Sequence, residues 1–316
     1  MSSEPVIECV PNFSEGNDLG KVTEIIRAMR VEGVRLLDYS LDPDHNRSVV
    51  TIAGPPDAVV EAAVRGVGRA AEVVDLTRQS GVHPRIGAAD VIPFVPVTGI
   101  SLAECAVLAR KAGLQIWRRY GVPVYFYGAA AARPDRIELE NVRRGQFEGL
   151  RELSLRDTSR RPDVGGPELH PTAGASAVGA RSFLIAYNVY LEPSSDRPQG
   201  SSMPVDIGAA RAVARDIRAS SGGLHGVKAI GVLANGRAQV SMNVTDFRLT
   251  PMRRVHEALC GLALRHGTVA GEAELIGLIP EEAYEAGAEW TEKIRNFDPA
   301  LKILERRFLQ PLLWPA

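Results

Sequence analysis

The chain has 316 residues, of which 45% are hydrophobic and 24% are charged, and its formal net charge is −1. This length can bury a full core in one or two domains, and the near-zero charge without a basic block excludes a general nucleic-acid or membrane-surface binder. The three cysteines, Cys9, Cys105 and Cys260, lie far apart, which argues against a disulfide framework and a structural zinc site. The sequence shows no secretory leader and no apolar run of membrane length, so we expect a cytoplasmic protein.

In the first half, short apolar runs rich in β-branched residues alternate with stretches of helical period. In chain order the predicted elements are a strand at Val6–Val10, a helix at Leu19–Arg30, strands at Val34–Asp38 and Ser48–Gly54, a helix at Pro56–Val74 and a strand at Asp90–Val97. This β-α-β-β-α-β order is ferredoxin-like. A helix at Ser101–Tyr120 and a strand at Val122–Tyr127 extend it, and residues 129–160 are polar and mostly helical or loop.

The second half repeats this order. Its predicted elements are a strand at Phe183–Leu191, a helix at Pro204–Ser220, strands at Val227–Leu233 and Ala238–Asn243, a helix at Pro251–His266 and a strand at Val269–Leu278. The Asn235-Gly236 pair between the two middle strands is a strong hairpin signal. We therefore predict an α/β (α+β) chain of two tandem ferredoxin-like (β-α-β-β-α-β) subdomains with extensions, comprising residues 1–181 and 182–316.

Residues 161–181 join the two halves and are rich in Gly, Pro and Ala, with no clear helical or strand period. A flexible linker has this composition. The run Pro162-Asp-Val-Gly-Gly-Pro167, however, is too rigid for a simple tether and rich in turn-forming residues. Ordered irregular backbone between domains is a common place for a ligand, so a linker and a binding segment are both open interpretations.

One loose motif is a false lead. Gly66-Val-Gly68-Arg-Ala-Ala71 fits the dinucleotide pattern GxGxxA, but that pattern binds a pyrophosphate only where it follows a strand and opens a helix. Here it lies inside a predicted helix, so we expect its small residues to allow close helix packing. The chain also has no GxxxxGK[ST], GxSxG or HExxH motif, which argues against a nucleotide enzyme and against the usual hydrolase and zinc-protease sites.

Three histidines fall in predicted loops, at His45, His83 and His170. A single loop histidine is usually solvated or structural. A metal site of His45 and His83 with Asp42 or Asp44 is conceivable, but these residues lack the spacing typical of metal ligands. We therefore predict no metal.

His83 differs from the other two in its surroundings. Pro84 restricts the backbone of the residue before it, and Arg85 carries a planar guanidinium that suits a carboxylate. A histidine on a stiff loop beside an anion-binding arginine is a plausible general base at neutral pH.

Several segments resemble the glutamate formiminotransferase family, over essentially the whole chain from about residue 6 to 310. They are Glu8–Gly16 (ECVPNFSEG), Asn46–Val49 (NRSV), Gly81–Asp90 (GVHPRIGAAD), Pro93–Pro96 (PFVP), Val122–Gly128 (VPVYFYG) and Gly179–Asn188 (GARSFLIAYN). The first and third are long and specific. Animal members carry a fused cyclodeaminase domain that this sequence does not contain, so we expect a single activity.

The resemblance implies two ferredoxin-like subdomains, a homodimer, and transfer of a formimino group between N-formimino-L-glutamate and N5 of tetrahydrofolate, the co-substrate, in histidine degradation. The family's catalytic histidine falls on His83. Its folate-binding loop falls on Gly165, Gly166, Pro167, Glu168, Leu169, His170, Pro171, Thr172, Ala173 and Gly174. This is the segment that already looked too ordered for a linker.

Two positions depart from the animal members. Ala173 stands where they have a tryptophan, so one aromatic surface near the folate is absent. Ser40 stands where they have an acidic residue in the loop between two strands, and Asp42 or Asp44 are candidates to replace it. Both differences bear on substrate affinity.

The chemistry needs a base that accepts a proton from N5 and returns it to the leaving amine, and His83 suits both steps. An aspartate is expected to stabilise the cationic intermediate and orient the imidazole; Asp44 is our choice, with Asp38 and Asp42 as alternatives. The carboxylates of glutamate and folate need cations. The candidates are Arg47, Arg85 and Arg181.

Three other functions fit parts of the pattern. The first is a folate enzyme that acts on 5-formyltetrahydrofolate, although the phosphate cradle that an ATP-dependent cyclisation requires is not evident. The second is a folate-binding protein without activity. The third is a regulatory module that binds a small molecule, which the fold alone would allow. His83 and Arg85 on one stiff loop favour catalysis.

Overall fold

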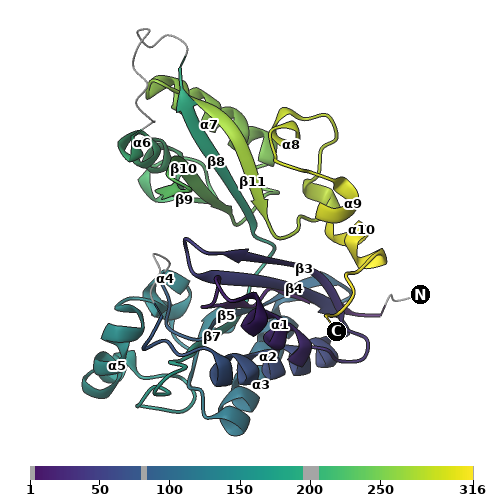
Figure 1. Cartoon of the computed structure of the whole chain (residues 1–316), viewed down its shortest axis with the longest axis vertical. Helices are drawn as coiled ribbons and strands as arrows, with labels where there is room; N and C mark the ends of the chain where they lie inside the picture. Colours follow the sequence, from purple (N-terminus) through teal and green to yellow (C-terminus); the bar gives the residue numbers. More distant parts are fainter. Residues whose placement is uncertain (1–3, 80–83, 195–205, 316) are drawn as a thin grey trace. The chain divides into compact units, whose positions relative to one another are not determined.

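The computed structural model describes residues 4–79, 84–194 and 206–315. The chain forms two compact units (Figure 1). Unit 1 comprises residues 1–182 together with 311–316, and unit 2 comprises residues 183–310. No helix in the described part of the chain is long and apolar enough to cross a bilayer.

Unit 1 is built on a mixed sheet. Its strands are β1 (Val6–Cys9), β2 (Asn12–Phe13), β3 (Arg35–Asp42), β4 (Arg47–Gly54), β5 (Ala89–Thr98), β6 (Val124–Gly128) and β7 (Ser176–Ala180). β1 and β2 follow one another between β4 and β5 and pair with both, β3 pairs with the outer side of β4, and β7 lies between β5 and β6. β5, β7 and β6 run parallel, whereas the pairs formed by β1 to β4 are antiparallel.

Helices α1 (Leu19–Ala28), α2 (Pro56–Val73) and α3 (Leu102–Tyr120) cover one face of this sheet (Figure 1). Their apolar residues, such as Val22, Ile25 and Ile116, join the main core with Ile52 and Phe94 of the strands. Burying each such side chain contributes about 1.5–3 kcal/mol relative to leaving it exposed. The short helices α4 (Leu139–Val142) and α5 (Gln146–Arg156) contribute to a smaller apolar cluster with two tyrosines of β6.

The glycine pair inside α2 makes room for neighbouring helices, as the sequence predicts. A Cβ at Gly66 would lie 2.8 Å from the side chain of Met29, and one at Gly68 would lie 2.3 Å from the ring of Tyr120. The interpretation of this segment as a packing surface rather than a dinucleotide site is confirmed.

Residues 161–181 contain a strand that the sequence analysis did not predict. β7 is buried along its whole length and hydrogen-bonds to a parallel strand on each side. Its residues are Ser, Ala, Val, Gly and Ala, so it lacks the β-branched and aromatic side chains by which strands are usually recognised. A Cβ at Gly179 would lie 2.5 Å from Tyr127, which shows why small residues are needed here.

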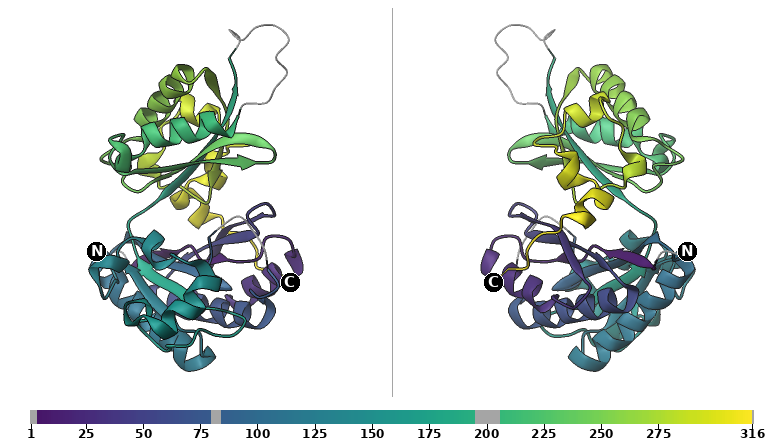
Figure 2. Two further views of the ribbon diagram at one scale, coloured as in Figure 1. Left: turned by 90° about the vertical axis from the view of Figure 1, so that its left-hand side faces the viewer. Right: turned by 90° about the vertical axis from the view of Figure 1, so that its right-hand side faces the viewer.

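Unit 2 has a four-stranded antiparallel sheet in the order β11-β8-β10-β9. The strands are β8 (Ile185–Pro193), β9 (Val227–Ala234), β10 (Arg237–Val244) and β11 (Thr268–Ile276), and the helices are α6 (Ile207–Ile217), α7 (Met252–Arg265), α8 (Glu289–Glu292), α9 (Pro299–Lys302) and α10 (Leu304–Leu309). α6 and α7 lie side by side on one face of the sheet (Figure 2). The predicted hairpin is confirmed: Asn235 and Gly236 both have positive φ, 52° and 69°, as a two-residue turn of this kind requires.

The prediction of two α+β parts with the same element order is confirmed. In each unit, the four strands of the β-α-β-β-α-β pattern lie in the spatial order fourth, first, third, second. In unit 1 the pattern is extended by α3, β6 and β7. The start of the predicted helix at Pro204–Ser220 lies outside the described residues.

The sequence analysis assigned residues 182–316 to one part, but the last of these belong to unit 1. The amide of Leu312 donates to the carbonyl of Leu36 at 2.8 Å. Leu312 and Trp314 pack against the main core of unit 1. Unit 2 is therefore an insertion in the chain of unit 1.

Candidate functional site

One edge of the unit 1 sheet collects several loops, and we call it the loop edge. β2 and β3 end there, while β4, β5 and β7 begin there, because Phe13 is in register with Ser48 and Ala89, and Val91 with Ala177. The loop edge consists of residues 14–16, 42–47, 79, 84–90, 143 and 170–176. It thereby joins segments that are far apart in the sequence.

Glu15 is the centre of a hydrogen-bond network at this edge, although only 2% of it is exposed. One carboxylate oxygen accepts from the amides of Asn17 and Asp18, both at 3.0 Å. The other accepts from Nε2 of Gln79 at 2.8 Å and lies 3.4 Å from Nζ of Lys21. A buried carboxylate with this many donors has its hydrogen-bonding capacity satisfied. It thereby links the loop that follows β2 to the segment at Gln79.

Gly16 fixes the distance between the loop that follows β2 and the turn from β3 to β4. A Cβ at this position would lie 2.3 Å from the carbonyl oxygen of Asp42, so no other residue fits without a shift of the backbone. The amide of Gly16 donates to Oδ1 of Asn46 at 2.9 Å, and Nδ2 of Asn46 donates to Oε1 of Gln79. Gln79 therefore contacts both Glu15 and Asn46.

His83, the predicted catalytic base, lies outside the described residues, as do residues 80–82. Arg85, two residues later, is 8% exposed. Its guanidinium donates to the carbonyl of Gln79 at 2.7 Å and to Glu148 of α5 at 3.1 Å. Its Nε is buried and makes no hydrogen bond with the described residues.

A second group of charges surrounds Asp90 at the start of β5, which is 2% exposed. It accepts from the amide of Ile86 at 2.7 Å and pairs with the guanidinium of Arg143. Burial lowers the pKa of Arg47, and the charge of Arg143 lowers it further, while Asp42 and Asp90 oppose the shift. Two arginines and two carboxylates, Asp42 and Asp90, thus lie close together at this edge.

The turn between β3 and β4 holds Asp42 and His45 together. Oδ2 of Asp42 lies 2.7 Å from Nδ1 of His45, and its Oδ1 accepts from the amide of His45 at 3.0 Å. Partial burial alone would raise the pKa of Asp42, but these hydrogen bonds and the charges of His45 and Arg47 lower it overall. Asp44, the predicted catalytic aspartate, is exposed on the same turn.

The second part of the predicted folate loop lies at the loop edge. The carbonyl of Ala173 accepts from the amide of Ala88 at 2.9 Å, and the carbonyl of Thr172 accepts from Leu76 at 2.9 Å. Nδ1 of His170 accepts from the amide of Ala173 at 3.0 Å, and burial lowers the pKa of this histidine. His170 thus shapes its own loop through this hydrogen bond.

The first part of that loop packs elsewhere on unit 1. Gly165 has a φ of 77°, and a Cβ there would lie 2.5 Å from the ring of Trp117 in α3. Gly166, Pro167 and Glu168 are exposed. The segment from Gly165 to Gly174 is therefore ordered at both ends, with an exposed middle.

Arg181 is not at the loop edge. It follows β7 at the end opposite Ser176, and its amide donates to the carbonyl of Phe94 at 3.1 Å. Burial raises the pKa of Tyr127 to about 12 against the influence of the charges on Arg181 and Arg143. The structure thus brings Arg47 and Arg85 to one edge and leaves Arg181 at the other end of a strand.

Four residues of this edge were not singled out by the sequence analysis: Glu15, Gln79, Asp90 and Arg143. Glu15 and Asp90 lie within two of the quoted motifs, which was an available signal. Arg143 lies in a polar segment without any motif. In the part of the chain that the structure describes, no group of three or more His, Cys, Asp or Glu side chains is placed to hold a metal ion.

Comparisons with known proteins agree with the motifs. The model of the formiminotransferase domain, N-terminal subdomain, matches residues 6–181, and that of the formiminotransferase domain matches residues 186–304. The glutamate formimidoyltransferase of Thermoplasma acidophilum is 41% identical over 307 residues, covering 96% of this chain and 97% of its own length. That of Streptococcus pyogenes serotype M1 is 41% identical over 307 residues, covering 96% and 99%.

A longer relative matches over part of its length. The formimidoyltransferase-cyclodeaminase of Sus scrofa is 38% identical over 296 residues, which are 92% of this chain and 53% of that protein. Both halves of the sequence thus align with the same kind of domain in proteins from widely separated organisms. The chain belongs to the formiminotransferase family.

Proposed function

We propose that the chain is a glutamate formimidoyltransferase, which moves a formimino group between N-formimino-L-glutamate and N5 of tetrahydrofolate. Two relatives that align with it over nearly their full length carry the first of these names. The structural observation that carries the proposal is the loop edge. There, several of the segments that resemble the family meet around arginine and carboxylate side chains that are largely buried.

The proposed reaction requires one proton to move between two nitrogens. N5 of the reduced folate attacks the formimino carbon, a new C–N bond forms, and the bond to the glutamate nitrogen breaks. His83 accepts the proton from N5 and donates it to the leaving amine. In support of this role, the described residues that flank it, Gln79 and Arg85, are held at the loop edge by partly buried hydrogen bonds.

The carboxylates of the formimino donor are proposed to bind to arginines of the loop edge. Arg47 and Arg143 lie near one another at this edge, together with the carboxylates of Asp42 and Asp90. The buried Nε of Arg85 makes no hydrogen bond with the residues that the structure describes. A guanidinium can bind a carboxylate through two parallel hydrogen bonds, which fixes its orientation as well as its position.

The aspartate that assists His83 is proposed to be Asp44. Asp42, the alternative in the same turn, already accepts two hydrogen bonds from His45. Asp44 is exposed on the same turn, where a bound ligand can reach its carboxylate. Arg181, at the other end of β7, is a candidate for the glutamate tail of the folate rather than for the reacting centre.

The pterin is proposed to bind along the segment from Gly165 to Gly174. Ala173 is 2% exposed and packs in the main core of unit 1. It therefore offers no surface on which the pterin ring could stack. The exposed part, from Gly166 to Glu168, remains for contact with the ligand. The carboxylate of Glu168 is suited to accept from the N–H groups of the pterin.

The reaction is tested by offering one donor at a time. N-formimino-L-glutamate with tetrahydrofolate should give formimino-tetrahydrofolate and glutamate, followed by absorbance and by amino-acid analysis. 5-Formyltetrahydrofolate is the competing substrate. Turnover of the formyl compound alone would favour the isomerase alternative, and protection against melting by folate without any turnover would favour an inactive binding protein.

The base is tested by His83→Ala, with His225→Ala in unit 2 as a matched control. We expect His83→Ala to retain folding and folate binding and to lose about 100- to 10,000-fold in rate. The control should keep its rate. Undiminished transfer by His83→Ala would remove the assignment of the base while leaving the reaction itself in place.

We further propose that the enzyme is a cytoplasmic homodimer, as the family resemblance implies. Sedimentation equilibrium of the purified protein should give twice the mass of one chain. A mass of one chain at micromolar concentration would contradict this part of the proposal.

A further inference from the structure

β9 forms the outer edge of the unit 2 sheet and pairs only with β10 among the residues that the structure describes. The turn at Asn235-Gly236 closes on the pair Ala234 and Arg237. In an antiparallel ladder, pairs that exchange backbone hydrogen bonds alternate with pairs that do not. The pair next to the turn exchanges them, so Ala234, Val232 and Ile230 hydrogen-bond to β10. The backbone groups of Ala229, Gly231 and Leu233 therefore point away from β10.

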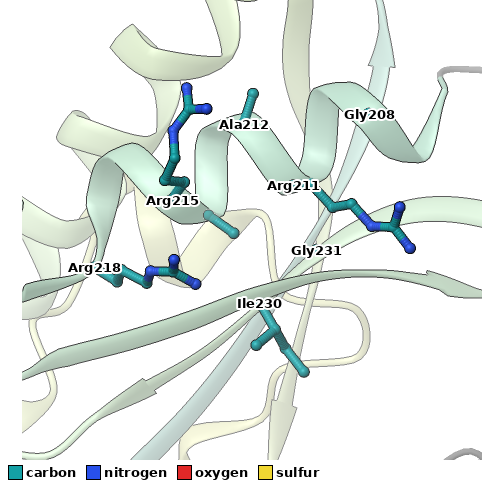
Figure 3. A pocket seen from close by; sticks show the side chains of 8 residues that line it. Gly208, Arg211, Ala212, Arg215, Arg218, Ile230 and Gly231 are labelled. Carbon is teal, nitrogen blue, oxygen red and sulfur yellow. The ribbon is translucent and has the colours of Figure 1, made fainter. Parts of the chain in front are cut away.

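A groove of about 420 Å³ lies between α6 and this edge (Figure 3). Its lining residues are Gly208, Arg211, Ala212, Ala214, Arg215, Arg218, Ile230 and Gly231. Gly231 permits the close approach of helix and strand, since a Cβ there would lie 2.3 Å from the amide nitrogen of Arg211. The groove belongs entirely to unit 2 and has no part in the proposed transfer reaction.

The three arginines occupy one flank of α6. The buried face is made by Ala210, Val213, Ala214 and Ile217. Each arginine follows Ala210, Ala214 or Ile217 by a single residue, a rotation of about 100°. The opposite flank faces α7, because Asp216 contacts Nε2 of His266 at 2.9 Å. The arginine flank therefore lies on the side of α6 toward the open edge of β9.

This flank carries more positive charge than its neighbours neutralise. Arg211 forms no hydrogen bond or ion pair with the described residues, and Arg218 donates through Nε to the hydroxyl of Ser221 at 2.9 Å. Arg215 pairs with Asp216 at 3.0 Å. Among the described residues, no acidic side chain lines the groove. Figure 3 shows Arg211 extending from the middle part of the helix and Arg218 from its C-terminal end.

The edge also exposes apolar side chains. Ile230 is 58% exposed and Leu233 is 53% exposed. Because successive residues of a strand point to opposite faces, Leu233 lies on the α6 side and Ile230 on the other side. An added strand would cover parts of both and would satisfy the outward backbone groups.

We propose that β9 is a docking site for an extended acidic peptide segment of a partner protein, which pairs with its outer edge as a fifth strand. Carboxylates at every second position of that segment would face Arg211, Arg215 and Arg218. The spacing is compatible, since alternate residues of a strand repeat every 6.8 Å or so and residues one helical turn apart repeat every 5.4 Å or so. The intervening side chains would be apolar and pack on Ile230.

A second copy of this chain fits the same edge less well. Two β9 strands paired across a two-fold axis would bring two α6 flanks together. Each flank carries Arg211, Arg215 and Arg218, and like charges that face one another across an interface oppose association. Charge complementarity therefore favours an acidic partner over self-association at this strand.

The test uses the whole protein and fluorescein-labelled synthetic peptides of eight residues, the length of β9. Glu alternates with Val, Ile or Thr in the test set, and Lys replaces Glu in the control set. Anisotropy should show binding of the Glu set only, weakened by salt. Hydrogen exchange should show added protection at Ala229, Gly231 and Leu233.

Variants separate charge from strand pairing. Arg211→Glu/Arg218→Glu should weaken binding at least about tenfold, while Arg254→Glu, an exposed change on α7, should not. Leu233→Pro removes an outward N–H without breaking the ladder to β10 and should weaken binding as well. Thermal melts establish that each variant is folded.

Three results of the peptide experiments would overturn the proposal. They are equal affinity for the Lys and Glu sets, unchanged amide protection in the presence of bound peptide, and absence of binding by every Glu peptide. A dimer that Leu233→Pro converts to a monomer would also overturn it, in favour of a second copy at this edge.

Discussion

Arg143 and Asp90 form an enclosed ion pair, with 15% and 3% of their side chains exposed. Removing one partner leaves the other buried charge with less compensation, since Asp90 then keeps, among the described residues, only the amide of Ile86 and the charge of Arg47. We expect Arg143→Met to lower the free energy of unfolding of unit 1 by about 3 kcal/mol, measured with urea, and Arg143→Lys to lower it by less. The double variant Asp90→Asn/Arg143→Met should recover part of the loss. An additive loss in the double variant would show that the pair is not coupled.

His256 gives unit 2 a pH dependence. It is 2% exposed, its Nδ1 lies 2.9 Å from the hydroxyl of Tyr187, and its Nε2 lies 3.5 Å from Sγ of Cys260. Burial lowers its pKa in the folded state, against the charge of Glu289. The unfolded chain therefore binds a proton more readily, so the contribution of this residue to stability is present above the unfolded pKa and is lost as the pH falls.

We expect the midpoint of urea unfolding of unit 2 to decrease between pH 7 and pH 5, and to decrease less in His256→Asn. Asparagine retains a group near the position of Nδ1 but does not titrate. An equal decrease in the variant would place the acid sensitivity in another residue.

At the scale of single residues, the sequence predicted the parts of the site that have distinctive chemistry. Arg47 and Arg85 were chosen because a guanidinium suits a carboxylate, and both lie at the loop edge. Glu15 and Arg143 were not chosen, because their importance depends on burial and on partners distant in sequence. Neither property is visible in a local pattern.

At the scale of elements, two glycines provide a matched test. A Cβ at Gly179 of β7 would lie 2.5 Å from Tyr127, whereas one at Gly261 of α7 has nothing within 4 Å. We expect Gly179→Ala to destabilise the protein by about 1–3 kcal/mol. Gly261→Ala should stabilise it by about 0.5–1 kcal/mol, because glycine is unfavourable in a helix interior. Similar effects of both changes in calorimetry would contradict the role assigned to β7.

β7 also shows which kind of element could not be predicted from the sequence. Elements with a clear apolar period, such as α2 and the β9–β10 hairpin, were predicted to within a few residues. β7 was missed, since it depends on a slot between β5 and β6 that only small side chains fit. The signal for such a strand lies in its neighbours rather than in its own residues.

At the scale of the whole molecule, the return of the chain to unit 1 is open to a simple test. Leu312 and Trp314 pack on the main core of that unit. We expect truncation after Gln310 to lower the stability of unit 1 by about 1–3 kcal/mol and to leave unit 2 unchanged. Calorimetry of the truncated chain, with Leu313→Ala as the control because Leu313 is 93% exposed, distinguishes the two units. An unchanged transition for unit 1 would contradict the packing role of this segment.

The docking of Leu312 beside Leu36 also sets an order of events during synthesis. A chain that leaves the ribosome N-terminus first can form the sheet of unit 1 early, and domains generally fold as they emerge. The contact with Leu36 has to wait until all of unit 2 has been translated. Until then the newly made unit 1 exposes the apolar surface that this segment later covers, which makes the nascent chain a candidate for chaperone protection at that stage.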